Sequence, residues 1–481
     1  MPNLKTLLPP DDPRLAILRD GETGQDRHCV LLWVQRAQRA TANLAANLAI
    51  DLADRLGLPV IAAFCLVPAF PRATRRAYHF MGEGLAELPD ALARRGVGWE
   101  LRAGEPAEVI PALTRDLAAA LVVTDQNALR IGHRWRSEVA AALTVPMVAV
   151  DADVVIPTAL FPKEEWAPRT MRPKVHRLLD RFLVPVPDPG PRHRSTHRAG
   201  PDPLTAVAAL DLDDRVGPTP NLPGGATAAR ARLRRFLDDQ LDGYDVNRDR
   251  ADIDGTSRLS PYVHYGQIGP LEIALAVRDA GRDGAPAEDV ASFLDELITN
   301  RELSVNFALR NPAYDRYEGI PDWGRKTLDE HRADARPVVY GLDTLDAAAT
   351  ADPVWNAAQR QMVADGWMPN RMRMYWAKQI VRWSATPEEA FDHTVALNDR
   401  YFLCGRDPVG YAQIAWAVGG RHDRPFPPNK PILGLVRPMG LGALKKNFDP
   451  AAYVRQIDER LGPAGGVQRS FLDDEHVTGI R

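Results

Sequence analysis

The sequence predicts an α/β domain with a doubly wound parallel sheet, followed by an all-α domain. Apolar, strand-like runs alternate with amphipathic stretches over residues 28–153. A stretch rich in proline and glycine lies between Val184 and Gly225, and helical periodicity dominates from Ala226 onward. We therefore expect an α/β domain at 1–183, a linker at 184–225 and a helical domain at 226–481.

Four apolar runs in the first part are typical of buried strands. Ala/Leu-rich helical patterns separate them, and this alternating order favours a parallel sheet with helices on both faces. No GxGxxG follows the first run, so the fingerprint of a dinucleotide-binding hydride-transfer domain is absent. The predicted strands are 28–34, 59–67, 119–125 and 146–152.

The linker is predicted from its proline and glycine content, and the helical part from the spacing of its apolar residues. The linker reads VPVPDPGPRHRSTHRAGPDP and then GPTPNLPGG, in which proline and glycine exclude long regular elements. The following segments repeat apolar residues with helical period and show almost no alternating runs. Helices are expected within 226–241, 288–310, 353–367 and 372–383.

Composition excludes several classes of protein. The chain has 481 residues, of which 45% are hydrophobic and 26% charged, as in ordinary globular proteins. It contains no apolar window of about 18 residues and no signal-like start, so we expect a cytoplasmic protein that does not enter membranes. Three cysteines without a CxxC pair or neighbouring histidines favour neither disulfides nor a metal site. A net charge of −3 argues against a wholly basic nucleic-acid coat but allows a local basic groove.

The segment from Asp254 to Gly266 (DGTSRLSPYVHYG) combines small hydroxyl residues with backbone donors ahead of a helical stretch. Such a segment can hold a phosphate, because unpaired N–H groups and the helix dipole favour an anion. The alternative is a plain helix N-cap at Ser260, followed by Pro261. Local chemistry leaves both interpretations open.

Trp376 and Trp383 are seven residues apart, which places them on one face of a helix, roughly 10 Å apart along its axis. Aromatic pairs at this spacing usually pack a core. A role in relaying electrons is the second interpretation.

At this point several motifs together resemble one family, the photolyase/cryptochrome family, and within it the class II cyclobutane pyrimidine dimer photolyases. The resemblance runs from about residue 28 to Phe448, and the number and order of the motifs carry it. The motifs are WVQRAQR (33–39), VVTD (122–125), RPKVH (172–176), TSRLS (256–260), WNAAQ (355–359), MRMYWAK (372–378), NDRY (398–401) and GGRHD (419–423).

The resemblance implies an antenna-type α/β domain and a helical domain that binds FAD. It also implies light-driven repair, in which excited, reduced FAD donates an electron to a cyclobutane dimer flipped out of damaged DNA and recovers it after the ring splits. A deazaflavin-type antenna pigment and a monomeric protein fit the same pattern. The residues that match FAD-binding positions are Tyr244, Thr256, Ser257, Arg258, Leu259, Ser260, Arg373, Asn398, Cys404 and Asp407.

The resemblance also implies catalytic and substrate-binding residues. Trp376, Trp355 and Trp383 match a chain of three tryptophans that delivers electrons to FAD, and Asn398 matches the residue beside flavin N5. Five further residues match positions that contact the lesion or the DNA. Without the resemblance, Glu296 would be interpreted as a carboxylate on a solvated helix face, and Arg424 and Arg437 as ordinary surface residues. These positions are Glu296, Asn300, Trp416, Arg424 and Arg437.

Departures from the family pattern concentrate near the flavin and lesion positions. Cys404 stands where the family has an Asp that pairs with the arginine matching Arg373, and Asn300 replaces a tryptophan of the lesion pocket. Val409, Pro369 and three further positions also differ; the three are Ala37, Asn370 and Phe426. Repair is the favoured function. The alternatives are a photolyase-like flavoprotein acting on a small-molecule ligand, and a cryptochrome-like light sensor, for which the expected long C-terminal extension is missing.

Overall fold

The computed structural model describes residues 2–23 and 27–463, which pack as two compact units. The first unit comprises the described residues up to Leu237 together with Leu259–Arg310. The second comprises Asp238–Arg258 and the described residues from Asn311 onward. This division by packing differs from the division by composition, and the domain boundaries expected at 183 and 225 stay a prediction.

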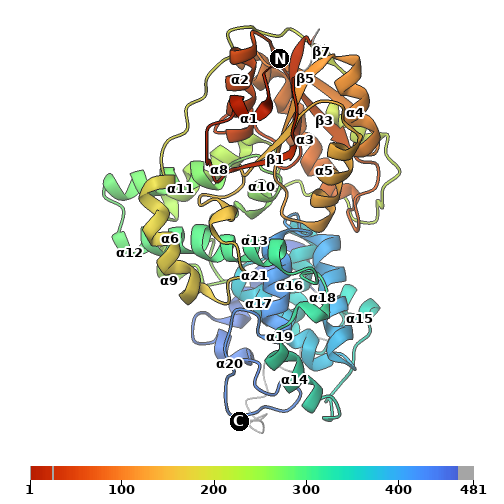
Figure 1. Ribbon diagram of the computed structural model, residues 1–481. Helices are drawn as coiled ribbons and strands as arrows, with labels where there is room; N and C mark the ends of the chain where they lie inside the picture. Colours follow the sequence, from red (N-terminus) through yellow and green to blue (C-terminus); the bar gives the residue numbers. More distant parts are fainter. Residues whose placement is uncertain (1, 24–26, 464–481) are drawn as a thin grey trace. The chain divides into compact units, whose positions relative to one another are not determined.

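A seven-stranded sheet forms the centre of the first unit, with the order β1-β6-β5-β2-β3-β4-β7 (Figure 1). All neighbouring strands are parallel except β1, which runs antiparallel to β6 at the edge. The predicted parallel sheet is therefore confirmed. The strands are β1 (Leu15–Arg19), β2 (Cys29–Val34), β3 (Val60–Leu66), β4 (Gly98–Ala103), β5 (Ala119–Asp125), β6 (Met147–Val150) and β7 (Arg198–Ala199).

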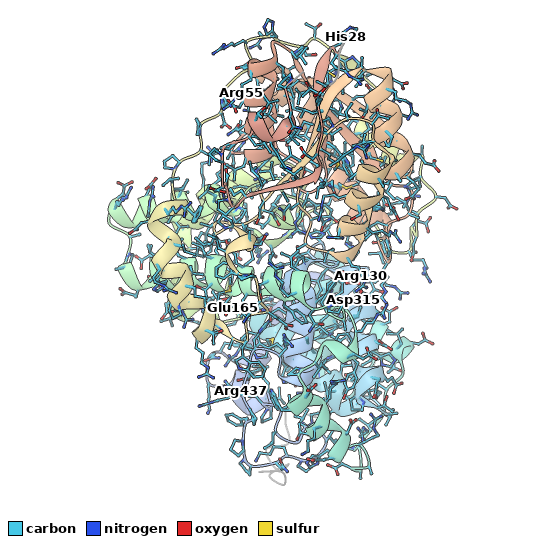
Figure 2. The ribbon with its side chains drawn as sticks, viewed as in Figure 1. His28, Arg55, Arg130, Glu165, Asp315 and Arg437 are labelled. Carbon is cyan, nitrogen blue, oxygen red and sulfur yellow. The ribbon has the colours of Figure 1, made fainter. Side chains whose placement is uncertain are left out.

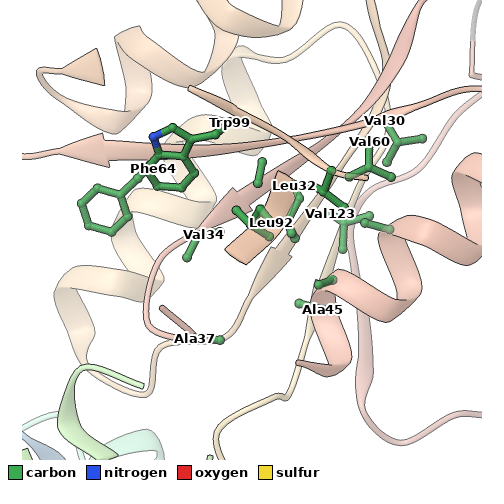
Figure 3. Packing of buried hydrophobic residues seen from close by; sticks show 14 of the residues in the cluster. Val30, Leu32, Val34, Ala37, Ala45, Val60, Phe64, Leu92, Trp99 and Val123 are labelled. Carbon is green, nitrogen blue, oxygen red and sulfur yellow. The ribbon is translucent and has the colours of Figure 1, made fainter. Parts of the chain in front are cut away.

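Each residue of β2, β3 and β5 is buried, because helices cover both faces of the sheet. Val30 and Leu32 point to one face, where they pack with Leu92 of a flanking helix (Figure 3). Leu31 and Trp33 point to the opposite face. The flanking helices are α2 (Leu44–Leu56), α3 (Arg75–Arg95), α4 (Pro106–Asp116) and α5 (Arg130–Ala142).

A buried network of charges closes the carboxyl ends of the central strands. Asp125, the last residue of β5, accepts hydrogen bonds from the backbone N–H groups of Gln35 (2.8 Å), Arg36 (2.6 Å) and Ala37 (2.9 Å). Asp153 accepts from Arg36 Nε at 2.6 Å and from Arg301 Nη2 at 2.8 Å. These bonds fix the turn after β2 and attach the sheet to the helix that contains Arg301.

The rest of the first unit is helical apart from the segment between 184 and 225, which holds only β7 and one short helix. The predicted helix over 288–310 forms as a continuous run of α12, a π-helical turn η2 and α13. The elements are α1 (Leu4–Leu7), η1 (Thr158–Leu160), α6 (Pro168–Phe182), α7 (Pro203–Ala208), α8 (Ala226–Asp239), α10 (Ser260–His264), α11 (Pro270–Arg282), α12 (Ala287–Leu294), η2 (Asp295–Asn300) and α13 (Arg301–Arg310).

In the second unit the described residues form helices and loops, with only one isolated bridge between Lys430 and Gly434. Helix α17 packs against α16, α18 and α19 (Figure 1). No helix in the described ranges is long and apolar enough to cross a membrane. The elements are α9 (Tyr244–Asn247), η3 (Tyr317–Gly319), α14 (Asp322–Glu330), α15 (Leu342–Asp346), α16 (Pro353–Asp365), α17 (Asn370–Trp383), α18 (Pro387–Tyr401), α19 (Pro408–Gly419), α20 (Leu441–Leu444) and α21 (Pro450–Leu461).

Candidate functional site

Three tryptophans of the second unit form a contact series. The rings of Trp376 and Trp355 are stacked, with centroids 6.2 Å apart and an interplanar angle of 9°. Trp355 then meets Trp383 edge-on, with centroids 5.7 Å apart. Trp376 and Trp355 are fully buried, and the side chain of Trp383 is 8% exposed to solvent. Trp355 thus contacts both residues that the sequence spacing placed on one face of α17.

Hydrogen bonds fix the orientation of the two inner indoles. Trp376 Nε1 donates to Gln359 Oε1, and Trp355 Nε1 donates to the carbonyl of Trp376, both at 2.9 Å. Asp352 caps α16 by accepting from the backbone N–H groups of Val354 and Trp355. Each indole donor is therefore satisfied inside the helical core.

Arg373, on the first turn of α17, points at the chain reversal between α18 and α19. Its guanidinium carbon lies 4.1 Å from the centre of the Phe402 ring, and Nη1 lies 3.7 Å from Cys404 Sγ. Nη2 donates to Asn398 Oδ1. Among the described residues no carboxylate lies within ion-pair distance of Arg373.

The carboxylates nearest to Cys404 in sequence, Asp399 and Asp407, have other partners. Asp399 accepts from Asn398 Nδ2 at 2.8 Å, from the Arg406 backbone at 3.1 Å and from Tyr411 OH at 3.0 Å. Asp407 caps α19 by accepting from the backbone N–H of Val409 at 2.8 Å. Asp407 therefore does not replace the family's aspartate as the partner of Arg373.

The segment from Tyr244 to Arg258 folds back on itself. Tyr244 is buried, and Arg258 pairs with Asp254 at 2.9 Å while its guanidinium lies 4.5 Å from the ring of Trp367. A Cβ on Gly255 would lie 2.7 Å from the carbonyl oxygen of Asn247, so only glycine fits there.

Part of the predicted anion-binding segment, Leu259 and Ser260, belongs to the first unit, and Thr256, Ser257 and Arg258 belong to the second. The alternative interpretation of Ser260 as an N-cap is wrong by one residue: α10 begins at Ser260, and Leu259 is its N-cap without a side-chain hydrogen bond. Because α10 has only five residues, its dipole contributes little, and a phosphate would depend on hydroxyl and backbone donors.

A second cluster lies where α19 ends and its following loop begins. Trp416 Nε1 donates to Asp423 Oδ2 at 3.4 Å, and Arg437 Nε approaches the same oxygen at 3.2 Å. The Arg437 guanidinium also lies 5.2 Å from the ring of Phe426, and Figure 2 shows the Arg437 side chain. Arg424 is exposed. Two predicted DNA contacts, Trp416 and Arg437, are thus brought together by one carboxylate.

Lys378 of α17 is a buried cation near this cluster. Its side chain is 4% exposed, and burial lowers the pKa of Lys378 to about 7. Asp423 raises that pKa and Arg437 lowers it, both by smaller amounts.

Glu296 and Asn300 lie in the first unit, both within the π-helical turn η2. Both side chains are partly buried, so Glu296 does not lie on a fully solvated helix face. The preceding residue, Asp295, pairs with Arg172 at 2.7 Å and anchors the turn to α6. π-Helical turns inside α-helices are frequent at functional sites.

The residues present fit an anionic cofactor such as FAD. Arg373 is a partly buried cation that no carboxylate neutralises, and Thr256 Oγ1 is buried without a hydrogen-bond partner among the described residues. Buried polar groups normally have a hydrogen-bond partner, and buried charges normally have an opposite charge nearby. Both groups would therefore gain from binding an anion or a hydrogen-bond acceptor. In the same ranges no three His, Cys, Asp or Glu side chains gather in a way that could hold a metal ion.

Sequence reasoning missed the residues that orient the site. Gln359 was visible only as the last letter of the WNAAQ motif, and its bond to Trp376 required the packing of α16 on α17. Asp423 was visible only as the last letter of the GGRHD motif, and Phe402 carries no pattern that distinguishes it from an ordinary core residue. Their roles depend on contacts that sequence spacing does not encode.

Comparisons with known proteins agree with this architecture. Residues 30–191 match the family model described as DNA photolyase. The deoxyribodipyrimidine photo-lyase of Methanothermobacter thermautotrophicus is 37% identical over 440 residues, covering 89% of this chain and 94% of that protein.

Two solved structures share the fold. The class III photolyase of Agrobacterium tumefaciens has a TM-score of 0.70 at 19% identity, covering 91% of this chain and 88% of that chain. The archaeal photolyase of Sulfolobus tokodaii, solved with two FAD molecules, has a TM-score of 0.64 at 18% identity, covering 89% of each chain.

Proposed function

The chain belongs to the DNA photolyase family and is a photolyase-like lyase, and from this premise we propose that it repairs cyclobutane pyrimidine dimers in DNA by the class II reaction. The single observation that supports this most is the series Trp376–Trp355–Trp383, in which each ring contacts the next. A core-packing role alone does not require an ordered series in which each indole contacts the next.

FAD is the proposed cofactor, and when bound it would supply the light-driven electron that opens the cyclobutane ring. Arg373, Asn398 and Cys404 would face its ring system, with Asp407 holding the start of α19 behind them. The phosphates would be held by Tyr244 and by the segment Thr256, Ser257, Arg258, Leu259 and Ser260. The unsatisfied Thr256 hydroxyl and the arginine without a carboxylate support this assignment.

Five residues would bind the lesion and the DNA. Glu296 would donate a hydrogen bond from its carboxylic acid to the pyrimidine carbonyls. Trp416 would stack on the flipped base, which is worth roughly 1–3 kcal/mol for an aromatic ring. Asn300 would leave the other wall of the pocket polar. Arg424 and Arg437 would contact phosphates beside the lesion.

A test of FAD binding precedes a test of repair. Purified protein should carry non-covalent FAD at close to one per chain. Ser257→Glu with Ser260→Glu should abolish it, because two carboxylates repel phosphates, whereas the exposed Ser137→Glu on α5 should not. Full retention of FAD by the double variant would remove the proposed phosphate site.

Repair itself is tested by incubating the purified protein with thymine-dimer DNA in blue light and in darkness. We expect dimer reversal in light only. Light-independent loss of dimers, or none in either condition with FAD present, would contradict the proposal. A deazaflavin-type antenna pigment, a monomeric state and a cytoplasmic location are further parts of it, checked by pigment extraction, by sedimentation and by cell fractionation.

A second function is favoured by one specific observation: among the described residues, no carboxylate lies within ion-pair distance of Arg373. A guanidinium fork suits a carboxylate or phosphate, so the alternative is a photolyase-like flavoprotein that binds a small anionic ligand. Cys404→Asp with Asn300→Trp should then raise dimer binding and reduce the natural activity. If the unmodified chain reverses dimers efficiently and the double change has little effect, this alternative fails.

A further inference from the structure

The positive charge of Arg373 is held in place by neutral groups. Asn398 Oδ1 accepts from Nη2, the Phe402 ring lies 4.1 Å from the guanidinium carbon, and Cys404 Sγ lies 3.7 Å from Nη1. Behind the guanidinium, a Cβ on Gly410 would lie only 3.3 Å from Nη2. These contacts fix the geometry of the cation without cancelling its charge.

Other charges of the same helix junction do not cancel it either. Asp399 is engaged by Asn398, by the Arg406 backbone and by Tyr411, and Asp407 is engaged by the N-terminus of α19. Cys404 is 6% exposed and occupies the place from which a carboxylate could reach Nη1. In a partly buried setting an uncompensated charge acts over a longer range than in water, because the effective dielectric constant is lower.

The side chain of Asn398 is fixed with its carbonyl oxygen facing Arg373. Its carbonyl is committed to Arg373 and its amide group to Asp399, so the side chain is held in one orientation with its acceptor facing the cation. It cannot turn to neutralise Arg373 further without losing one of two buried hydrogen bonds.

We propose that Arg373, left without a carboxylate partner because residue 404 is cysteine, makes the bound FAD easier to reduce by stabilising the negative charge that the ring system gains. This inference rests on the proposed function. Two-electron reduction adds two electrons and one proton to the neutral oxidised ring, so the product carries one negative charge, which the fixed guanidinium favours. In the test the two electrons come from dithionite and the proton from water, and none comes from Cys404.

The test is the midpoint potential of the bound FAD, measured by equilibration with a reference dye during reduction by dithionite. Cys404→Asp supplies the missing carboxylate, and Cys404→Asn has nearly the same shape without charge. We expect Cys404→Asp to shift the reduced-to-oxidised equilibrium at least tenfold toward the oxidised form, about 30 mV for a two-electron couple, and Cys404→Asn to shift it less than threefold.

Arg373 provides an independent pair of variants. Arg373→Gln should shift the equilibrium in the same direction as Cys404→Asp, and Arg373→Lys should retain most of the original value. Equal potentials in Cys404→Asp and Cys404→Asn overturn the inference, as does loss of FAD from Cys404→Asp alone, because a new ion pair should stabilise this junction. Absence of FAD from the unmodified protein would instead contradict the proposed function.

Discussion

The indole rings of Trp355 and Trp376 lie nearly parallel, 9° apart in orientation, although they come from different helices. Trp355 Nε1 donates to the carbonyl of Trp376, and Trp376 Nε1 donates to Gln359, one turn further along the helix of Trp355. The two residues therefore fix each other's position through both their rings and their polar atoms. This mutual arrangement gives the proposed electron relay a defined geometry.

Trp376→Phe should block light-driven reduction of oxidised FAD by more than tenfold. The substitution keeps most of the aromatic volume, so FAD content should persist, at a cost of about 1–3 kcal/mol because Gln359 loses its donor. Photoreduction followed by absorption spectroscopy measures the effect. Trp323→Phe on α14, outside the series, is the matched control. Equal rates of photoreduction in the two variants would show that the three tryptophans only pack the core.

Lys378→Met should raise the free energy of unfolding at neutral pH by roughly 1–3 kcal/mol, because a buried cation is removed. The folded pKa of Lys378 is about 7, below its usual value of 10.5. Below pH 7 the lysine is charged in both states and burial costs its full amount. Between pH 7 and 10.5 the unfolded chain binds more protons, so this cost disappears as pH rises.

Denaturant unfolding of both proteins across this pH range measures the Lys378 effect. The stability difference between variant and wild type should shrink from pH 7 to pH 10. The exposed Lys326→Met is the control and should show a small, constant difference. A pH-independent difference for Lys378→Met would mean that the lysine is not desolvated in the folded state.

Asp352→Ala should destabilise the protein by more than an ordinary helix cap, by about 2–3 kcal/mol. Asp352 accepts from two backbone N–H groups of α16 and also from the buried Tyr375 hydroxyl, which would lose its partner. Asp449→Ala, at the exposed cap of α21, removes one backbone contact and an exposed ion pair with Arg455, and should cost about 1 kcal/mol or less. Thermal unfolding compares the two, and equal costs would show that the Tyr375 contact contributes nothing.

Arg437→Ala should weaken binding to dimer-containing and intact DNA by a similar factor, since a phosphate contact carries no information about the lesion. The slope of log Kd against the logarithm of the salt concentration should decrease by about one. Fluorescence anisotropy at several salt concentrations provides the measurement. Arg198→Ala, which removes an exposed arginine of β7, should leave the slope unchanged; a loss confined to damaged DNA would assign Arg437 to the lesion itself.

The fold class was predictable because its signals are local. Continuous apolar runs identified β2, β3, β5 and β6, whose residues are buried on both faces. The edge strand β1 was missed because its residues are half-exposed and carry no buried run, and β7 because two residues give no period. β4 was missed because two charged residues, Glu100 and Arg102, interrupt its apolar run.

The candidate site was only partly predictable. Family resemblance supplied Arg373 and Cys404, but the ring of Phe402 beside the guanidinium and the acceptor from Asn398 depend on the turn between α18 and α19. Likewise, the helical period placed Glu296 on a regular helix, whereas a π-helical turn carries it. A one-residue insertion into a helical repeat changes side-chain direction without changing composition, so a periodicity argument cannot detect it.

The division of the first unit into Leu259–Arg310 and the residues up to Leu237 bears on how the chain is synthesised. All seven strands have been synthesised by residue 200, yet the buried Asp153 lacks Arg301 until that residue has been added. At translation rates of about 5–20 residues per second, the interval between Leu237 and Arg310 lasts roughly 4–15 s. During this interval the nascent sheet lacks the Arg301 partner of Asp153, so part of its buried ionic network is incomplete.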